Sequence, residues 1–307
     1  MWGLAMQVLP GRRSLLQRVL FCLALLLIFL VPSHRMGAQD ASAARTDELL
    51  PQACPSSLTS GDVIQCAIGA AGEIDSFTIA LSSGDRIRLR VVETSGNLVA
   101  RREISRPNGT TLCSGFSPDL TCQADTNGTF TVKISGNSTT TGSYSLYVQR
   151  LNGPAGCSAV SFGAAATTSI GAAVEHDCYT MSLNAGDRVR VRAVETSGAL
   201  IAFREILRPN GTTLCSGFSP DLTCLIDING THTVLIRDNT INTGSYGFYA
   251  QQLNNPAGCS AVSFGAVAQA SIGAAVEHDC YTMTLSAGDR VRVRAVETSG
   301  ALIAFRE

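Results

Sequence analysis

The amino-acid sequence repeats itself with a period of 102 residues. Residues 157–205 recur as residues 259–307, and only five of the 49 aligned positions differ. The same offset carries RPNGTTLCSGFSPDLTC from Arg106–Cys122 onto Arg208–Cys224. Solenoid repeats have periods of about 20–50 residues, whereas about 100 residues is the size of one autonomous domain. The chain is therefore a tandem array of one domain.

Short joints separate the copies. Residues 152–156 (NGPAG) and 254–258 (NNPAG) connect them, so neighbouring copies are expected to lie close together. We place the first complete copy at residues 54–153 and the second at 157–255. Residues 259–307 are expected to be a third, truncated copy, whose apolar side chains lack a second sheet to pack against.

Residues 1–38 have the form of a secretory signal peptide. Three arginines precede the apolar run Val19–Val31, which Pro32 ends. A basic region before a short apolar core is typical of a signal peptide, whereas a spanning helix needs about 20 apolar residues. We expect cleavage after Ala38, or alternatively after Ala43, a linker over residues 39–53, and export. An uncleaved anchor is the other interpretation, and it is the only membrane contact that the sequence suggests.

The ten cysteines after this segment are expected to form five disulfides. Two cysteine spacings recur at the 102-residue offset. In the first copy Ser76 stands where the second has Cys178, yet Cys66 appears ten residues earlier, so the count stays even. Zinc sites usually show C-x-x-C pairs or added histidines, and an exported chain meets an oxidising environment. The predicted pairs are Cys54–Cys66, Cys113–Cys122, Cys157–Cys178, Cys215–Cys224 and Cys259–Cys280.

Each complete copy has the pattern of an all-β sandwich. Arg188–Thr196 (RVRVRAVET) alternates with a period of two, which predicts a half-buried strand. Turn sequences such as Pro209–Thr212 separate further short runs, because Pro presets φ and Asn-Gly tolerates positive φ. About eight short strands at intervals of 8–12 residues, without helical periodicity, predict a β-sandwich.

One order of motifs runs through both complete copies. In the first copy the motifs are Glu73/Asp75/Phe77, Ser83–Arg86, Pro107–Leu112, Asn127–Val132 and Thr141–Val148. In the second they are Glu175/Asp177/Tyr179, Ala185–Arg188, Pro209–Leu214, Asn229–Val234 and Thr243–Tyr249. This order resembles the bacterial pre-peptidase C-terminal domain over nearly all of each copy. The resemblance implies a jelly-roll-like β-sandwich that accompanies secreted enzymes, commonly peptidases, without being catalytic. Relatives in collagenases bind collagen and calcium. The family does not require these cysteine pairs.

Residues 40–307 are not expected to contain a catalytic site. They lack a G-x-S-x-G elbow and an H-E-x-x-H motif. Glu175 and Asp177 flank His176, but the period of a strand sends the two acids to one side and the histidine to the other. We interpret this run as a solvated entrance to a strand.

Calcium is the one cofactor that the sequence suggests. Glu73 and Asp75, which recur as Glu175 and Asp177, offer the hard oxygens that calcium prefers. The alternative is that these four residues are plain surface carboxylates.

Two further features are candidates for ligand binding. Arg188, Arg190 and Arg192 share one face of a strand, where guanidinium groups suit acidic glycans. Alternatively, they form an exposed face that pairs with acids on neighbouring strands, such as Glu103 or Glu205. The disulfide-closed loop CSGFSPDLTC, identical in both copies, carries Phe116 or Phe218. A stapled loop loses little entropy on binding, so each aromatic either recognises a partner or packs into the core.

The charge balance excludes a basic footprint for nucleic acid, because 23 Lys and Arg face 24 Asp and Glu. The sequence therefore predicts a secreted or cell-surface, non-catalytic module for binding, adhesion or spacing. Its expected partner is a polysaccharide or an extracellular protein polymer. The alternative is the accessory N-terminal region of a secreted hydrolase, a peptidase, whose catalytic domain lies beyond residue 307.

Overall fold

Residues 54–304 and 306 are described by a computed structural model, and their regular secondary structure consists of β-strands. The expected signal peptide and the linker at residues 39–53 lie outside the described residues. Across the part of the chain that the structure describes, no helix has both the length and the apolar character needed to cross a bilayer.

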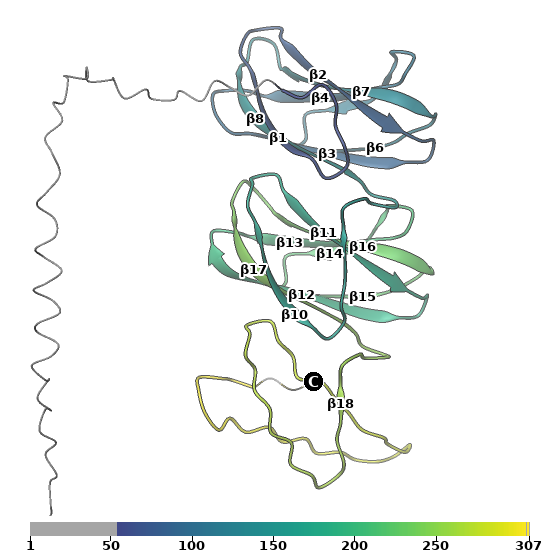
Figure 1. Cartoon of the computed structure of the whole chain (residues 1–307), viewed down its shortest axis with the longest axis vertical. Coiled ribbons are helices and arrows are strands. Elements are labelled where there is room, and N and C mark those ends of the chain that lie inside the picture. The colour runs from purple at the N-terminus through teal and green to yellow at the C-terminus, as the bar shows by residue number, and fades with distance from the viewer. Residues whose placement is uncertain (1–53, 305, 307) are drawn as a thin grey trace, which may run out of the picture. The chain divides into compact units, whose positions relative to one another are not determined.

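The first copy is an eight-stranded sandwich. Its strands are β1 (Val63–Ile68), β2 (Ile74–Leu81), β3 (Arg86–Glu93), β4 (Ala100–Ser105), β5 (Thr111–Gly115), β6 (Asp119–Gln123), β7 (Gly128–Gly136) and β8 (Gly142–Arg150). They form two four-stranded antiparallel sheets in the orders β1-β8-β3-β6 and β2-β7-β4-β5. Figure 1 shows these sheets as two layers. The strand order is that of a jelly roll, in which two sheets enclose one core.

The second copy repeats this topology. Its strands are β9 (Ser158–Ala159), β10 (Ala165–Ile170), β11 (His176–Leu183), β12 (Arg188–Gly198), β13 (Ala202–Leu207), β14 (Thr213–Gly217), β15 (Asp221–Leu225), β16 (Gly230–Asp238) and β17 (Gly244–Gln252). The sheet orders are β10-β17-β12-β15 and β14-β13-β16-β11-β9. The predicted fold class, an array of disulfide-stapled β-sandwiches, is confirmed.

Each core lies between the two sheets of its own copy. In β3, Ile87, Leu89 and Val91 point inward and are fully buried, as the period of two predicts. Full burial of such a side chain contributes about 1.5–3 kcal/mol relative to exposure. The second copy builds its core from the matching residues, such as Val189 and Val191 of β12. The two cores share no residue, so each sandwich is a complete folding unit.

All five predicted disulfides are present. Cys113 on β5 and Cys122 on β6 join the two sheets of the first copy, and Cys215–Cys224 does the same in the second. Five disulfides are typical of a chain that folds in an oxidising environment.

The described residues of the third copy carry little pairing. They contain two short strands, β18 (Ser260–Ala261) and β19 (Tyr281–Thr282), which pair in parallel beside the Cys259–Cys280 disulfide. Apolar side chains that are buried in the second copy are exposed here. Val293 is 61% exposed, whereas its counterpart Val191 is buried.

Candidate interaction surface

The two complete copies belong to one structural unit and contact each other through the outer faces of two sheets. The docking face is the outer face of the first copy's β1-β8-β3-β6 sheet with the residue after β8, namely Arg88, Arg90, Asp119, Tyr147, Gln149 and Leu151. The receiving face belongs to β11, β13 and β16 of the second copy, namely His176, Cys178, Phe203, Glu205, Leu207, Leu235 and Arg237. These side chains occupy the outward positions of strands whose inward positions build the cores.

A buried ion pair connects the two faces. The Arg88 guanidinium donates two hydrogen bonds to the Glu205 carboxylate, Nη1 to Oε2 at 2.6 Å and Nη2 to Oε1 at 3.1 Å. Both side chains are buried. Burial raises the pKa of the Glu205 carboxyl, but the hydrogen bonds and charge of Arg88 outweigh it and hold this pKa below its ordinary value. Glu205 is therefore a carboxylate whose charge Arg88 balances.

Arg90 makes a second polar contact between the copies. Its Nη2 donates to the carbonyl oxygens of Asn239 at 3.2 Å and Thr240 at 3.1 Å, in the loop after β16. Its Nη1 donates to Asp119 of its own copy at 3.0 Å, and Arg237 of the second copy lies 3.6 Å from the same carboxylate. Asp119 thus lies between an arginine from each copy.

Three leucines close the apolar part of this surface. Leu151, Leu207 and Leu235 form a separate, fully buried cluster against Cys178. The turn at Gly211 also lies here, with φ of +76°. A Cβ at Gly211 would lie 2.9 Å from the Cβ of Leu151, which is too close for an unshifted side chain.

His176 lies in the contact between the copies, which its sequence pattern did not indicate. The predicted solvated strand entrance is wrong, because His176 is only 5% exposed and its ring lies 4.3 Å from the ring of Tyr147 in the first copy. Neither ring nitrogen has a hydrogen-bond partner among the described residues. Burial, reinforced by the positive charges of Arg237, Arg88 and Arg90, holds the pKa of His176 well below its ordinary value, so the ring is neutral.

Arg188, Arg190 and Arg192 lie on the outward face of β12 and are exposed or half-buried, whereas Arg88 and Arg90, the counterparts of Arg190 and Arg192 in the first copy, are buried. In the first copy, Arg88 finds its acid in the next copy and not on a neighbouring strand of its own sheet. In the second copy, Arg192 pairs with Asp221 of the adjacent strand at 2.5 Å, and the Arg188 backbone N–H donates to Asn254. Binding of acidic glycans by Arg188, Arg190 and Arg192 stays a prediction.

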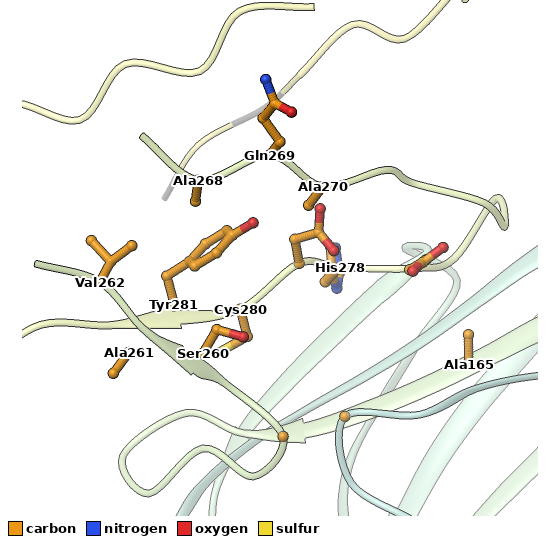
Figure 2. A pocket seen from close by; sticks show the side chains of 14 residues that line it. Ala165, Ser260, Ala261, Val262, Ala268, Gln269, Ala270, His278, Cys280 and Tyr281 are labelled. Atoms are coloured by element: carbon orange, nitrogen blue, oxygen red, sulfur yellow. The ribbon is translucent and has the colours of Figure 1, made fainter. Parts of the chain in front are cut away.

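The same contact begins again after the second copy. The rings of Tyr249 and His278 lie 4.9 Å apart, which repeats the contact of Tyr147 with His176. A recess accompanies each junction, about 560 Å³ beside His176 and about 640 Å³ beside His278. Figure 2 shows the second recess, in which the labelled His278 and Tyr281 lie opposite residues 268–270.

The four calcium candidates have structural contacts. Glu73 accepts hydrogen bonds from the backbone N–H groups of residues 69 and 70, and Glu175 does the same at residues 171 and 172. Asp75 accepts a hydrogen bond from the Tyr144 hydroxyl at 2.6 Å, and Asp177 accepts one from Tyr246 at 2.6 Å. Burial raises the pKa of both aspartates. Calcium binding stays a prediction, and each carboxylate has a role without it.

One cluster in the described residues resembles a metal site by distance alone. Ligand atoms of Cys54, Cys66 and Asp75 lie within 4.8 Å of one another. The two sulfurs are joined in a disulfide, however, and so are not thiolates that could bind a metal.

The stapled loops present their aromatic residues to solvent. Phe116 and Phe218 are each 50% exposed, so neither packs fully into a core. A buried arginine binds the backbone of each loop: Arg102 donates to the Phe116 carbonyl at 2.7 Å, and Arg204 donates to the Phe218 carbonyl at 2.9 Å.

These two buried arginines were not predicted. Arg102 and Arg204 lie between the sheets, and burial lowers the pKa of both. The signal was present in the period of two, since Arg102 has the same inward parity as Ile104.

Comparisons with known proteins return distant likenesses. No protein-family model matches the chain, and no curated protein matches it. A periplasmic inhibitor of g-type lysozyme, PliG from Aeromonas hydrophila, is 13% identical with a TM-score of 0.25, covering 31% of this chain and 96% of its own. The CUB1-EGF-CUB2 domain of human MASP-1/3 is 10% identical with a TM-score of 0.20, covering 61% and 99%. The resemblance to the pre-peptidase C-terminal domain stays a prediction.

Proposed function

We propose that this chain is an exported, non-catalytic spacer in which successive β-sandwiches are held in a fixed orientation. The observation that carries the proposal is the buried contact between copies, where Arg88 pairs with Glu205 beside the leucine cluster. Independent domains on a flexible tether would leave these side chains in water. A spacer gains from such a contact because the distance between its ends is then set by packing.

The joint between the copies is ordered as well. The Asn152 side chain accepts a hydrogen bond from the Arg86 N–H at 2.6 Å and donates to the Gly84 carbonyl at 3.1 Å. Asn254 makes the same two contacts at the next joint, with Arg188 and Gly186. Because its first residue is tied to the sandwich, the joint has little freedom to swing.

Export agrees with the five disulfides and with the signal-like segment. The contacts of the candidate acids support a non-catalytic role. Asp177 accepts hydrogen bonds from Tyr246 and Thr168, and the neutral His176 packs between copies, so the two do not form an acid–base pair.

Backbone NMR relaxation of residues 54–255 tests the spacer. Both copies should report the same long rotational correlation time, that of one body. Arg88→Glu places two carboxylates face to face and should shorten this time toward that of a single sandwich. Arg101→Glu, on the opposite sheet of the first copy, is the matched control and should leave it unchanged. Separate tumbling of the copies in the unaltered protein would contradict the proposal.

Binding to an extracellular polymer is a second function, favoured by one observation. Each complete copy presents a half-exposed phenylalanine, Phe116 or Phe218, on a disulfide-stapled loop. Two weak contacts on one chain strengthen each other, because the second binds at a high effective concentration. Residues 54–255 should then bind a polysaccharide or collagen more tightly than either copy alone.

Paired substitutions test this second function, in the presence and absence of calcium. Phe116→Ala with Phe218→Ala should remove the binding. The control is Val99→Ala with Ile201→Ala, which also truncates one exposed apolar residue in each copy at matching positions away from the stapled loops. Equal binding by both double variants, or by one and two copies, would leave only the spacer.

A further inference from the structure

We propose that the first copy is a terminal unit whose receiving face is built to refuse a neighbour. The docking face of the second copy, by contrast, fits the receiving face of another copy of the second type. The inference concerns the contact itself and holds whether the array is a spacer or a binding module.

The docking face is the same in both complete copies. All six residues of the docking face recur at the 102-residue offset. The pairs are Arg88/Arg190, Arg90/Arg192, Asp119/Asp221, Tyr147/Tyr249, Gln149/Gln251 and Leu151/Leu253. The second copy therefore carries the complete chemistry needed to dock onto a further copy.

The receiving face differs between the copies at every one of its seven residues except Glu205, whose counterpart is Glu103. The exchanges from the second copy to the first are His176 to Ile74, Phe203 to Arg101, Leu207 to Ser105, Leu235 to Lys133, and Arg237 to Ser135. Among the inward residues of the same strands, Ala100/Ala202, Arg102/Arg204, Ile104/Ile206, Val132/Val234 and Ile134/Ile236 are identical, whereas Phe77/Tyr179, Ile79/Met181 and Phe130/His232 differ. The exchanges are thus more frequent on the outer face, where they replace apolar residues by charged or small polar ones at Arg101, Ser105 and Lys133.

In the first copy, the exchanged residues pair with an outer-face carboxylate of the same copy. In the second copy, the matching carboxylate pairs instead with Arg88 of the first copy. Glu103 is the counterpart of Glu205. It pairs with Arg101 at 2.7 Å, accepts a hydrogen bond from Ser105 at 3.0 Å and lies 3.4 Å from Lys133. All three partners stand where the second copy has an apolar residue. An arginine that approached Glu103 would therefore meet two positive charges, and like charges at an interface are strongly unfavourable.

Burial follows the same division. In β16 both faces are buried from residue 232 to residue 236, whereas in β7 burial alternates and the outer face is only half-buried. The turn at Gly109 has nothing within 4 Å of a built Cβ, whereas its counterpart Gly211 lies against Leu151.

The position of one disulfide also differs between the copies: Cys157–Cys178 of the second copy reaches the outer face, whereas Cys54–Cys66 of the first copy does not. Cys178 contacts the leucine cluster between copies, but its counterpart Ser76 is exposed. The first copy instead uses Cys66, which lies on β1 and is buried with the core.

A polar terminal face has a physical purpose in an array of this kind. Contacts between two different faces leave one face of each kind free, so they allow open-ended association unless the copies close into a ring. Solenoid repeat proteins remain soluble because their terminal units have polar outer faces, and the same physical reason applies to sandwiches that stack face to face. The first copy supplies such a face on the amino-terminal side.

Exchange of the five residues tests the proposal in residues 54–255, which contain two sandwiches with separate cores. The unaltered protein should be monomeric. The exchanged variant carries Ile74→His, Arg101→Phe, Ser105→Leu, Lys133→Leu and Ser135→Arg. It should associate head to tail, because the second copy of one molecule can dock onto the first copy of the next. A short joint holds two copies of one chain at an effective concentration of about 1 mM. Sedimentation equilibrium at protein concentrations up to this value should therefore show an average mass at least twice that of the monomer.

Two further variants decide the outcome. Adding Arg190→Glu to the exchanged protein should restore the monomer, since Arg190 is the counterpart of Arg88. The reverse exchange places the first copy's five residues in the second copy, and its copies should then tumble independently in NMR relaxation.

A folded exchanged variant that stays monomeric would overturn the proposal, as would association that survives Arg190→Glu. If the exchanged variant does not fold, the reverse exchange decides alone. Copies that still tumble as one body after it would also refute the terminal-unit role.

Discussion

Arg88 and Glu205 lie 117 positions apart, in different copies, yet their side chains form a buried pair with two hydrogen bonds. Withdrawing two charges from water is costly, and the mutual attraction repays this cost only when the geometry is good. The main effect of such a pair is therefore to specify which faces meet and in which register.

Loss of one partner from this pair should separate the copies. Arg88→Ala leaves Glu205 buried without a counter-charge, which costs about 3–5 kcal/mol. Undocking returns the carboxylate to water and so limits the loss. We expect faster hydrogen exchange across β13 and β16, with both cores intact. Glu103→Ala is the control, because its partner Arg101 is partly exposed, and it should cost about 1 kcal/mol or less. Equal effects of the two substitutions would show that the pair between copies has no special role.

Two glycines at matching positions separate backbone strain from contact between copies. Gly211 and Gly109 have φ of +76° and +83°, so replacement by alanine strains both turns by about 1–2 kcal/mol. Only at Gly211 does the new Cβ meet Leu151. Urea denaturation should therefore show a larger loss of stability for Gly211→Ala than for Gly109→Ala, and only Gly211→Ala should loosen the docking. Identical losses would contradict the close approach at the junction.

Acid should weaken the contact through His176. Its pKa lies below the ordinary value of 6.5 in the docked state, so the separated state binds more protons at any pH between the two values. Docking is then fully stable above about pH 6.5 and weakens as the pH falls toward 5. Arg88, Arg90 and Arg237 increase this effect, because a charged imidazole would face three cations.

The pH effect is checked by comparing the unaltered protein with His176→Ile, which has the residue of the first copy. The correlation time of residues 54–255 should fall between pH 7 and pH 5 only in the unaltered protein. His232 also has a lowered pKa, caused by burial, and it is present in both proteins, so its contribution cancels. The same pH dependence in both proteins would exclude His176 as the cause.

The stapled loops should stabilise each sandwich measurably. Cys215→Ala with Cys224→Ala opens a loop whose cysteines are nine residues apart. The chain-entropy description predicts a loss of about 2–3 kcal/mol in the free energy of unfolding.

Peptide mapping without reduction should find no free thiol among the ten cysteines of the exported chain. Free Cys113 and Cys122 in that material would contradict the pairing.

Local patterns predicted the strands and disulfides correctly because both depend on short-range chemistry. The alternation of Arg188–Thr196 follows from the geometry of a strand, and β12 covers that segment. The cysteine pairs were recognisable because the repeat offset sorted them into register. Arg102 could have been read from the same alternation, although its carbonyl partners come from three separate positions in the fold.

The sequence by itself determined that this protein is an array of disulfide-stapled β-sandwiches, because period, turns and cysteine register are properties of neighbouring residues. A period of two assigns Arg88 and His176 to the outward face of a strand, but it does not distinguish water from another sandwich. Only the tertiary structure decided that these side chains are buried, since burial depends on which two sheets meet. The same contact explains why Lys133 and Ser105 matter. Their counterparts Leu235 and Leu207 pack against Leu151 between the copies, so the polar residues at these two positions distinguish the outer face of the first copy from that of the second.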